Sequence, residues 1–168
     1  MAVTEQISDK GPWMTQNFEG WRESPYKDTR GIRTVGWGFN MQDPTVAKML
    51  PVEVLNGKRA LTLEEAQPIY EQLYQRATQD AIAYVGGPEV FSQLDPQRQN
   101  AIVDMAYNMG AAKLAEFKRM QAALKSQNWE QAALEAQDSN WYKQVGNRSK
   151  HVTKLLREGS GVGKKGRQ

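Results

Sequence analysis

The sequence contains no cysteine. Thiol catalysis, cysteine-ligated zinc and disulfide bonds are therefore excluded, and the redox compartment stays open. A chain of 168 residues does not need such cross-links. A chain of this size buries roughly 70% of its unfolded surface in one core. We expect a single domain that folds without a disulfide or a metal.

Long hydrophobic runs are also missing, since the chain nowhere has the consecutive apolar residues that a membrane span needs. Residues 1–11 are polar and lack the apolar centre of a signal peptide. We therefore expect a chain that is made as a soluble cytoplasmic protein. A substrate outside the cytoplasm would have to be reached by another route, such as a membrane lesion or a delivery device.

Acidic residues are scarce towards the C-terminus. Between residues 140 and 168 a single acid, Glu158, stands against eight lysines and arginines, while the whole chain has a net charge of +3. A basic end favours an anionic polymer as partner, whether nucleic acid, acidic lipid or an anionic cell wall. A solvated helix face followed by a loose tail explains the same charges equally well, so charge alone does not identify the partner.

A helix and a hairpin are expected at the start of the chain. Pro12 suits the first turn of a helix, and Gly20 follows its end. Residues 24–39 then alternate like strands, with residues 28–31 (Asp-Thr-Arg-Gly) as the turn. On the returning strand, glycines leave one face without side chains, which suits the close approach of a ligand or another backbone.

The rest of the chain is predicted to be helical. Asp43 and Pro44 are typical of a helix start, and residues 62–65 (Thr-Leu-Glu-Glu) form a capping box before a long apolar repeat. Pro68 lies beyond the first turn of that helix and should bend or fray it. Further helices are expected from Asp95-Pro96 to Gly110 and at residues 116–126, 129–136 and 149–157, with Asn128 and Asn147 as caps.

These elements predict an α+β protein that is mostly helical. A small lobe with the β-hairpin is expected at about residues 18–58, and a helical lobe at about residues 62–158 together with the first helix. Ligands favour the cleft at such a boundary. Residues 160–168 have little to bury and are expected to be a disordered basic tail.

Glu19, Asp28 and Thr34 carry the candidate chemistry. Hydrolysis of a glycosidic bond needs a carboxylic acid that is protonated near neutral pH, and a second group that attacks the sugar or activates a water. A helix end and a hairpin turn can bring Glu19 and Asp28 to face each other across a groove, with the Thr34 hydroxyl beside Asp28. Isolated residues of these types are mostly solvated surface, so their spacing alone supports catalysis only weakly.

Their setting resembles a known family. Glu-x8-Asp-x5-Thr, embedded in Phe-Glu-Gly-x-Arg, Tyr-Lys-Asp-Thr-x-Gly and Thr-Val-Gly-x-Gly, is similar to phage lysozymes of the T-even type, also called endolysins or muramidases. The resemblance covers roughly residues 12–159. It continues in the same order through Ala101-Ile-x-x-Met105, Met109-Gly110, Phe117, Trp129-Glu-x-Ala-Ala133, Trp141-Tyr142 and Asn147-Arg148.

The resemblance implies a lysozyme-like fold and hydrolysis of the β-1,4 bond between N-acetylmuramic acid and N-acetylglucosamine in peptidoglycan. It implies Glu19 as the general acid, Asp28 as the carboxylate that steers or activates water and stabilises positive charge on the sugar, and Thr34 as a water-holding residue. In this family water enters opposite the leaving group, so inversion is expected. No cofactor or metal is implied, and we expect a monomer.

Three further residues match family positions. Arg148 resembles an arginine that reaches the catalytic glutamate, and Asn40 and Tyr107 resemble residues that contact the saccharide. The alternatives are a surface arginine on the basic last helix, and a core or rim role for Tyr107.

The chain also departs from the family pattern. Phe39 replaces a histidine, so an ion pair made by that histidine is absent. Met120 and Glu135 replace smaller polar residues at the family's cleft, which leaves the subsite contacts open.

The function therefore has one leading interpretation and several alternatives. As an endolysin, the protein would reside in the host bacterial cytoplasm and act on the periplasmic wall after release through a separate membrane pore. A virion-associated lysozyme and an inactive wall-binding protein are the alternatives, and the basic tail would contact the anionic wall or outer membrane. Nucleic-acid binding lacks interleaved aromatics and a motif. Transglycosylation needs no water, so Asp28 and Thr34 favour hydrolysis.

Overall fold

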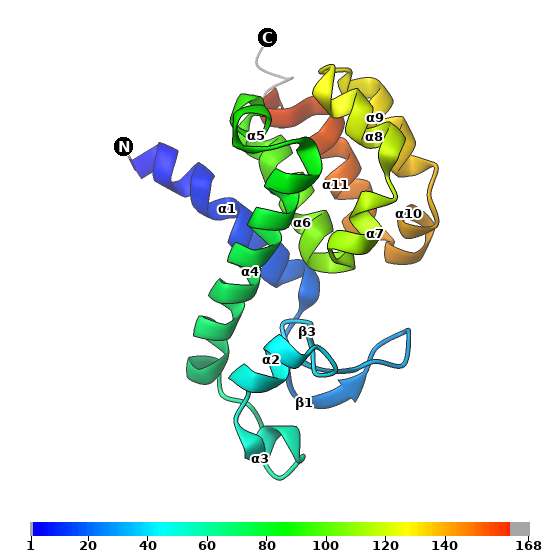
Figure 1. Ribbon diagram of the computed structural model, residues 1–168. Helices are drawn as coiled ribbons and strands as arrows, with labels where there is room; N and C mark the ends of the chain where they lie inside the picture. The colour runs from blue at the N-terminus through cyan, green and yellow to red at the C-terminus, as the bar shows by residue number, and fades with distance from the viewer. Residues whose placement is uncertain (1, 162–168) are drawn as a thin grey trace. The chain divides into compact units, whose positions relative to one another are not determined.

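The computed structural model describes the backbone of residues 2–161 and the side chains of residues 11–160. The chain is mostly helical with one small antiparallel sheet, which confirms the predicted α+β class. It divides into two compact units (Figure 1). One unit comprises residues 14–75, here called the sheet unit, and the other comprises residues 1–13 and 76–168, here called the helical unit.

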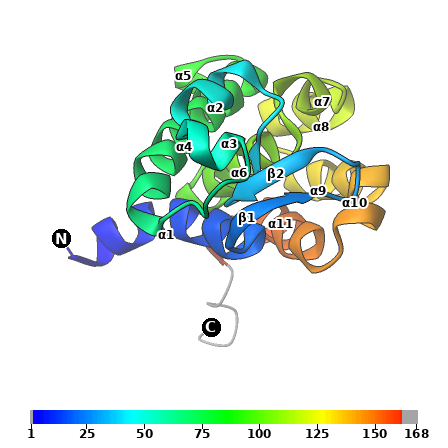
Figure 2. The same ribbon diagram turned by 90° about the horizontal axis from the view of Figure 1, so that it is seen from below.

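The sheet unit contains a three-stranded sheet in the order β1-β2-β3. Strand β2 is central and pairs antiparallel with both neighbours. Figure 2 shows β1 and β2 side by side. The elements of this unit are the end of α1 (Ala2–Glu19), β1 (Arg22–Lys27), β2 (Arg33–Gly36), β3 (Phe39–Asn40), α2 (Pro44–Met49), α3 (Val52–Leu55) and the first part of α4 (Leu63–Val85).

Aromatic side chains join the sheet to α4 within the sheet unit. The Trp37 ring lies 4.7 Å from that of Trp21, 6.3 Å from that of Phe39 and 5.6 Å from that of Tyr70, measured between centroids. Phe39 and Val35 are fully buried on one face of the sheet. Ring pairs at these distances add to the stability that burial of the apolar surface provides. This packing supports β2, which carries Thr34, and the hairpin whose turn contains Asp28.

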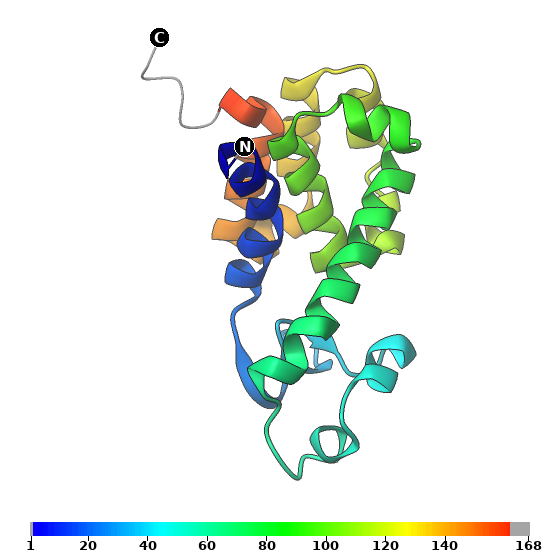
Figure 3. The same cartoon turned by 90° about the vertical axis from the view of Figure 1, so that its left-hand side faces the viewer.

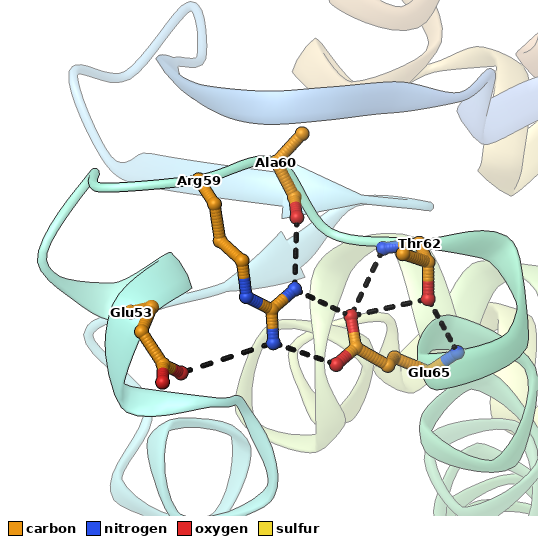
Figure 4. Close-up of polar contacts among 5 residues, drawn as sticks. All are labelled: Glu53, Arg59, Ala60, Thr62 and Glu65. Atoms are coloured by element: carbon orange, nitrogen blue, oxygen red, sulfur yellow. Dashed lines mark hydrogen bonds and ion pairs between the residues drawn. The ribbon is translucent and has the colours of Figure 1, made fainter.

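The start of α4 is fixed by the predicted capping box, which Figure 4 shows. The Thr62 hydroxyl accepts the Glu65 N–H at 3.1 Å, and the Glu65 carboxylate accepts the Thr62 N–H at 3.1 Å. The Arg59 guanidinium adds two hydrogen bonds to Glu65, at 2.8 and 2.9 Å, and lies 3.8 Å from Glu53. The carboxylate of Glu65 is thus held by charged and uncharged donors, which also tie the preceding loop to the helix.

This network predicts an unusual titration of Glu65. The hydrogen bonds from Arg59, and then those from Thr62, lower the pKa of Glu65 from 4.5 to about 2. A pKa that folding lowers stabilises the folded state above the unfolded value, and this contribution is lost as the pH falls from about 4.5 through 2. Carboxyl-detected NMR should find a Glu65 midpoint near 2, and Arg59→Met should move it towards 4.5. A midpoint near 4.5 in the wild type would contradict the network.

In the helical unit, α11 (Asn147–Glu158) packs against α6 (Pro96–Met109) and α9 (Trp129–Gln137). Figure 3 shows the chain from a second side. Helix α6 begins after Asp95 and ends at Gly110, as predicted. Its apolar face is fully buried at Ile102 and Met105. The further elements are the end of α4, α5 (Pro88–Gln93), α6 (Pro96–Met109), α7 (Ala111–Ala115), α8 (Lys118–Lys125), α9 (Trp129–Gln137), α10 (Asn140–Val145), α11 (Asn147–Glu158) and the 3-10 helix η1 (Gly159–Gly161).

The C-terminal end of α11 is held by Arg98. Its guanidinium donates to the carbonyl oxygens of Leu156 and Arg157 at 2.7 Å and to the Asp95 carboxylate at 2.9 Å. Ser160 also donates to Asp95, at 2.8 Å. The expected loose tail therefore begins later than residue 160, because these bonds hold the first turn beyond α11. The rest of the predicted tail, residues 162–168, lies outside the described residues.

Several helix boundaries differ from the prediction. Helix α1 begins at Ala2, and Pro12 lies inside it. A proline removes one backbone hydrogen bond and bends a helix, but it does not prevent residues on its N-terminal side from being helical. Helix α11 begins at Asn147, with Gly146 at the cap position that was predicted for Asn147. The short helices α3, α5, α7 and α10 were not predicted, since pieces of four to six residues show too little periodicity.

Candidate functional site

Glu19 is the last residue of α1 and is half-buried. The helix stops there because Gly20 adopts a positive φ of 71°, while its N–H donates to the Gln16 carbonyl at 3.0 Å. The amide of Gln16 also bonds the Gln67 side chain at 3.2 Å, which attaches this end of α1 to the start of α4. The carbonyl end of a helix carries a partial negative charge and favours a protonated carboxyl over an ionised one.

Gly38 lies directly against the Glu19 side chain. A Cβ atom at Gly38 would be 2.8 Å from the carboxyl carbon of Glu19 and even closer to one of its oxygens. The φ of Gly38 is +72°, in a region that side chains disfavour. The sequence predicted that glycines here allow a close approach, and the structure shows that the approaching group is the candidate acid itself.

Replacing Gly38 by alanine should therefore damage the site. The methyl group would displace the Glu19 carboxyl, and a misplacement of about 1 Å costs roughly 100-fold in rate. The positive φ should add about 1 to 3 kcal/mol of destabilisation. Gly57→Ala is the matched control, because its φ is +73° and its nearest atom, on Arg33, is 3.6 Å away. Urea unfolding should show the same destabilisation in both variants, whereas the rate of wall digestion should fall in Gly38→Ala alone. Equal digestion rates in the two variants would show that Gly38→Ala does not displace the Glu19 carboxyl.

Asp28 occupies the turn between β1 and β2, where residues 28–31 form the predicted turn. One carboxylate oxygen accepts the N–H groups of Arg30 at 2.8 Å and Ile32 at 2.9 Å. The other oxygen lies 3.6 Å from the Arg30 guanidinium. Burial raises the pKa of Asp28, but the two backbone N–H bonds and the Arg30 charge outweigh it and lower the pKa below its usual value. Asp28 is therefore an ionised carboxylate at neutral pH, in a fixed orientation.

Thr34 lies at the centre of the sheet, in β2. It pairs with Tyr26 of β1 on one side and with Asn40 of β3 on the other. Its hydroxyl donates to the Ile32 carbonyl at 2.8 Å, and the residue is only 4% exposed. A hydroxyl has one hydrogen, so this bond leaves the Thr34 oxygen as an acceptor for any further partner.

Tyr26 lies within electrostatic reach of both candidate carboxylates. Burial, followed by the negative charges of Glu19 and Asp28, raises the pKa of Tyr26, while Arg22 acts in the opposite direction. The sheet unit therefore brings Glu19, Asp28 and Thr34 around one tyrosine. The sequence did not single out Tyr26, although its place two residues before Asp28 was part of the quoted motif.

Asn40 ends the sheet at β3. Its side-chain oxygen accepts the Gln42 N–H at 2.8 Å, and its backbone carbonyl accepts the Asp43 N–H at 3.1 Å. The side-chain oxygen is thus occupied, whereas the amide N–H groups have no hydrogen-bond partner among the described residues. Asn40 can donate to a ligand without breaking the bonds that hold its loop.

Arg148 and Tyr107 belong to the helical unit. Arg148 is 7% exposed and makes a bidentate ion pair with Asp104, at 2.9 and 3.0 Å. Tyr107 is half-buried near the end of α6. The interpretation of Arg148 as a surface arginine is wrong, because its side chain is buried and paired. The roles that the resemblance gives to Arg148 and Tyr107 at the catalytic site stay predictions.

Asp104 was not identified from the sequence. The sequence does contain an indication of its role, because Asp104 is a single acid within the apolar run Ile102-Val-Asp-Met-Ala106. A buried charge needs a partner, so this pattern predicts a buried ion pair. Of the two positions that depart from the family pattern, Met120 is fully buried in α8, and Glu135 is half-buried in α9 and accepts from Gln131 at 2.7 Å.

Neither a metal site nor a membrane-spanning helix is found among the described residues. No group of three or more His, Cys, Asp or Glu side chains is arranged to hold a metal ion. In the same part of the chain, no helix combines the length and apolar character that crossing a membrane requires.

Comparisons with known proteins agree with the motif. A model of the phage lysozyme family matches residues 16–158. The pre-baseplate central spike protein Gp5 of Enterobacteria phage T4 is 28% identical over 157 residues, which cover 88% of this chain but only 27% of the spike protein. Two proteins of Dictyostelium discoideum, named probable T4-type lysozymes 2 and 1, are both 27% identical, over 160 and 158 residues, with coverage of 88% of this chain and 93% of their own length.

Proposed function

Because the chain belongs to the phage lysozyme family, we propose that it is a peptidoglycan hydrolase that cleaves the β-1,4 bond between N-acetylmuramic acid and N-acetylglucosamine. The observation that best supports this proposal is the contrast between the two carboxyl groups around Tyr26. Asp28 is surrounded by donors that stabilise its charge, whereas Glu19 lies at the carbonyl end of a helix. Two carboxyl groups whose environments differ in this way are suited to act as acid and as anion.

Glu19 is the general acid in this proposal. The carboxyl group is half-buried, lies at a helix C-terminus and shares its surroundings with the ionised Asp28. In this proposal the Glu19 carboxyl group gives its proton to the leaving sugar oxygen. The close packing against Gly38 keeps the carboxyl in one place.

Asp28 and Thr34 place the water. The Thr34 oxygen and the Asp28 carboxylate are both acceptors, so they bind the two hydrogens of a water and leave its lone pair for the anomeric carbon. Asp28 also stabilises the positive charge that develops on the sugar. Attack from the face opposite the leaving group would give inversion.

The remaining site residues keep the roles that the family resemblance implies. Asn40 contributes amide donors to the saccharide, Tyr107 contributes an aromatic contact, and Arg148 orients Glu19. The ion pair with Asp104 matters for the proposed role of Arg148, because Asp104 compensates much of the arginine charge. An uncompensated arginine would favour the ionised form of a neighbouring acid.

We propose that the protein is an endolysin, which resides in the host bacterial cytoplasm and reaches the cell wall after a separate pore opens the membrane. The alternative of a virion-associated lysozyme is favoured by the similarity to a phage spike protein, although the chain matches about a quarter of that protein. Proteomic analysis of purified virions separates the two: recovery of the chain from washed particles supports the second, and its recovery only from lysates supports the first.

Digestion of purified peptidoglycan tests the reaction itself. Mass analysis of the released muropeptides should find new reducing ends on N-acetylmuramic acid. Anhydro-muramic ends would instead establish a transglycosylase. Binding to the wall without release of any fragment would establish a catalytically inactive wall-binding protein.

A further inference from the structure

Three hydrogen-bonding side chains form a row across the sheet. Tyr26, Thr34 and Asn40 are directly paired in the strand register, one on each strand. Directly paired residues point to the same face of a sheet. Since neighbouring strands lie about 4.8 Å apart, the row extends over about 10 Å. Thr34, at its centre, and Asn40, at its end, already have places in the proposed reaction, whereas Tyr26, at the other end, has none.

The ring of Tyr26 is held in place by Arg22. The carbon of the guanidinium lies 4.1 Å from the centre of the ring, which is the geometry of a cation–π contact. The side chain is half-buried, and its hydroxyl has no hydrogen-bond partner among the described residues. Tyr26 therefore combines a fixed orientation with an unused donor.

The surroundings of this hydroxyl are acidic. Burial, and after it the negative charges of Glu19 and Asp28, disfavour the phenolate and raise the pKa of Tyr26. The raised pKa keeps the hydroxyl protonated over the whole pH range in which a carboxyl pair of this kind operates. It stays a neutral donor near two carboxyl groups that take part in the proposed reaction.

We propose that Tyr26 binds the saccharide at the point of cleavage, with its hydroxyl donating a hydrogen bond to the N-acetylhexosamine unit between Glu19 and Asp28. The assignment rests on the proposed function and adds a substrate contact to it. Tyr26, Thr34 and Asn40 then form a continuous edge of hydrogen-bonding groups along the sugar chain. Arg22 contributes indirectly, because it orients the ring.

The kinetic test compares Tyr26→Phe with the wild type and with Tyr142→Phe. The first change removes the hydroxyl and keeps the ring. Tyr142 is the matched control, since it is a half-buried tyrosine of the helical unit whose hydroxyl also has no hydrogen-bond partner in the described chain. We expect Tyr26→Phe to lower kcat/KM on peptidoglycan about tenfold, which is the typical effect of one lost neutral hydrogen bond. Tyr142→Phe should leave kcat/KM unchanged.

A binding test does not depend on hydrolysis. The β-1,4-linked tetramer of N-acetylglucosamine is titrated into Glu19→Gln protein that carries labelled tyrosine, and the ring resonances are followed by NMR. We expect the chemical shifts of the Tyr26 ring to change with tetramer concentration until the protein is saturated, while those of Tyr142 stay constant. Addition of Tyr26→Phe to this variant should weaken the measured Kd several-fold.

The outcomes separate the two proposals. A wild type that releases no fragment from the wall refutes the proposed function, and the titration then decides on Tyr26: saturable movement supports the saccharide contact, and its absence refutes it. An active wild type with unchanged kcat/KM in Tyr26→Phe and unmoved Tyr26 resonances refutes the contact and leaves the function intact.

Discussion

Replacement of Glu19 by glutamine is expected to lower the rate of peptidoglycan cleavage by about a thousandfold. Glutamine has nearly the same shape and can keep the packing against Gly38, but it has no proton to give to the leaving oxygen. The free energy of unfolding should change by less than about 0.5 kcal/mol, because the residue is half-buried and the volume is conserved. Release of reducing ends and urea unfolding measure the two effects.

Glu23→Gln is the control for this change. Glu23 lies four residues further on in β1, its side chain is exposed, and its backbone carbonyl accepts the Leu61 N–H at 2.8 Å. Removal of its charge should leave the cleavage rate unaltered. The assignment of the acid is wrong if Glu19→Gln digests walls at the rate of Glu23→Gln.

The largest expected change in stability follows from Asp104→Ala. Asp104 is fully buried, and its two carboxylate oxygens accept hydrogen bonds from Nε and Nη2 of Arg148. Removal of one member of a buried ion pair takes that partner from the charge that stays buried and typically costs about 3 to 5 kcal/mol. Urea unfolding of the purified protein should show this loss as a lower midpoint.

Two variants control for the position and for the charge. Glu130→Ala removes a carboxylate that bonds Arg157 at the same distance, 2.9 Å, but at a side chain that is 62% exposed. Arg157 is 31% exposed and also donates to the Gln137 side chain at 2.8 Å, so water and Gln137 still compensate its charge and the cost should stay below about 1 kcal/mol. Asp104→Asn keeps one acceptor for Arg148 and should lie between the two alanine variants. A similar cost for Asp104→Ala and Glu130→Ala would show that the buried pair contributes no more than an exposed one.

Local sequence signals were reliable wherever the interaction joins residues a few positions apart. The capping box of residues 62–65, the cap at Asp43, the cap at Asn128 and the stop at Gly110 were all predicted and are all present. Each depends on one side chain and one nearby backbone group, so the surrounding tertiary structure has little influence. The hairpin was predicted for the same reason, since its turn closes within residues 28–31.

Boundaries that depend on packing were predicted less well. The short helices α3, α7 and α10 are examples, because each buries one apolar side chain, and such packing stabilises a short segment that has weak propensity of its own. Asn147 is a good cap by residue type, but Gly146 takes that place. A cap requires a particular backbone geometry as well as a suitable side chain.

The sequence by itself determined the class of fold and the residues that carry the candidate chemistry. Glu19, Asp28 and Thr34 follow from a short motif, and the motif was legible because all of it lies within one helix end and one hairpin. Their roles in catalysis stay predictions.

Only the tertiary structure decided the surroundings of these groups. The contact of Gly38 with Glu19 joins residues on separate elements, the row from Tyr26 to Asn40 depends on the strand register, and the pair of Asp104 with Arg148 joins two helices. A register shift by one residue would turn Tyr26 to the other face of the sheet, and nothing in the composition of the hairpin reports that shift. Residue types state which chemistry is available, and folding decides which groups share one environment.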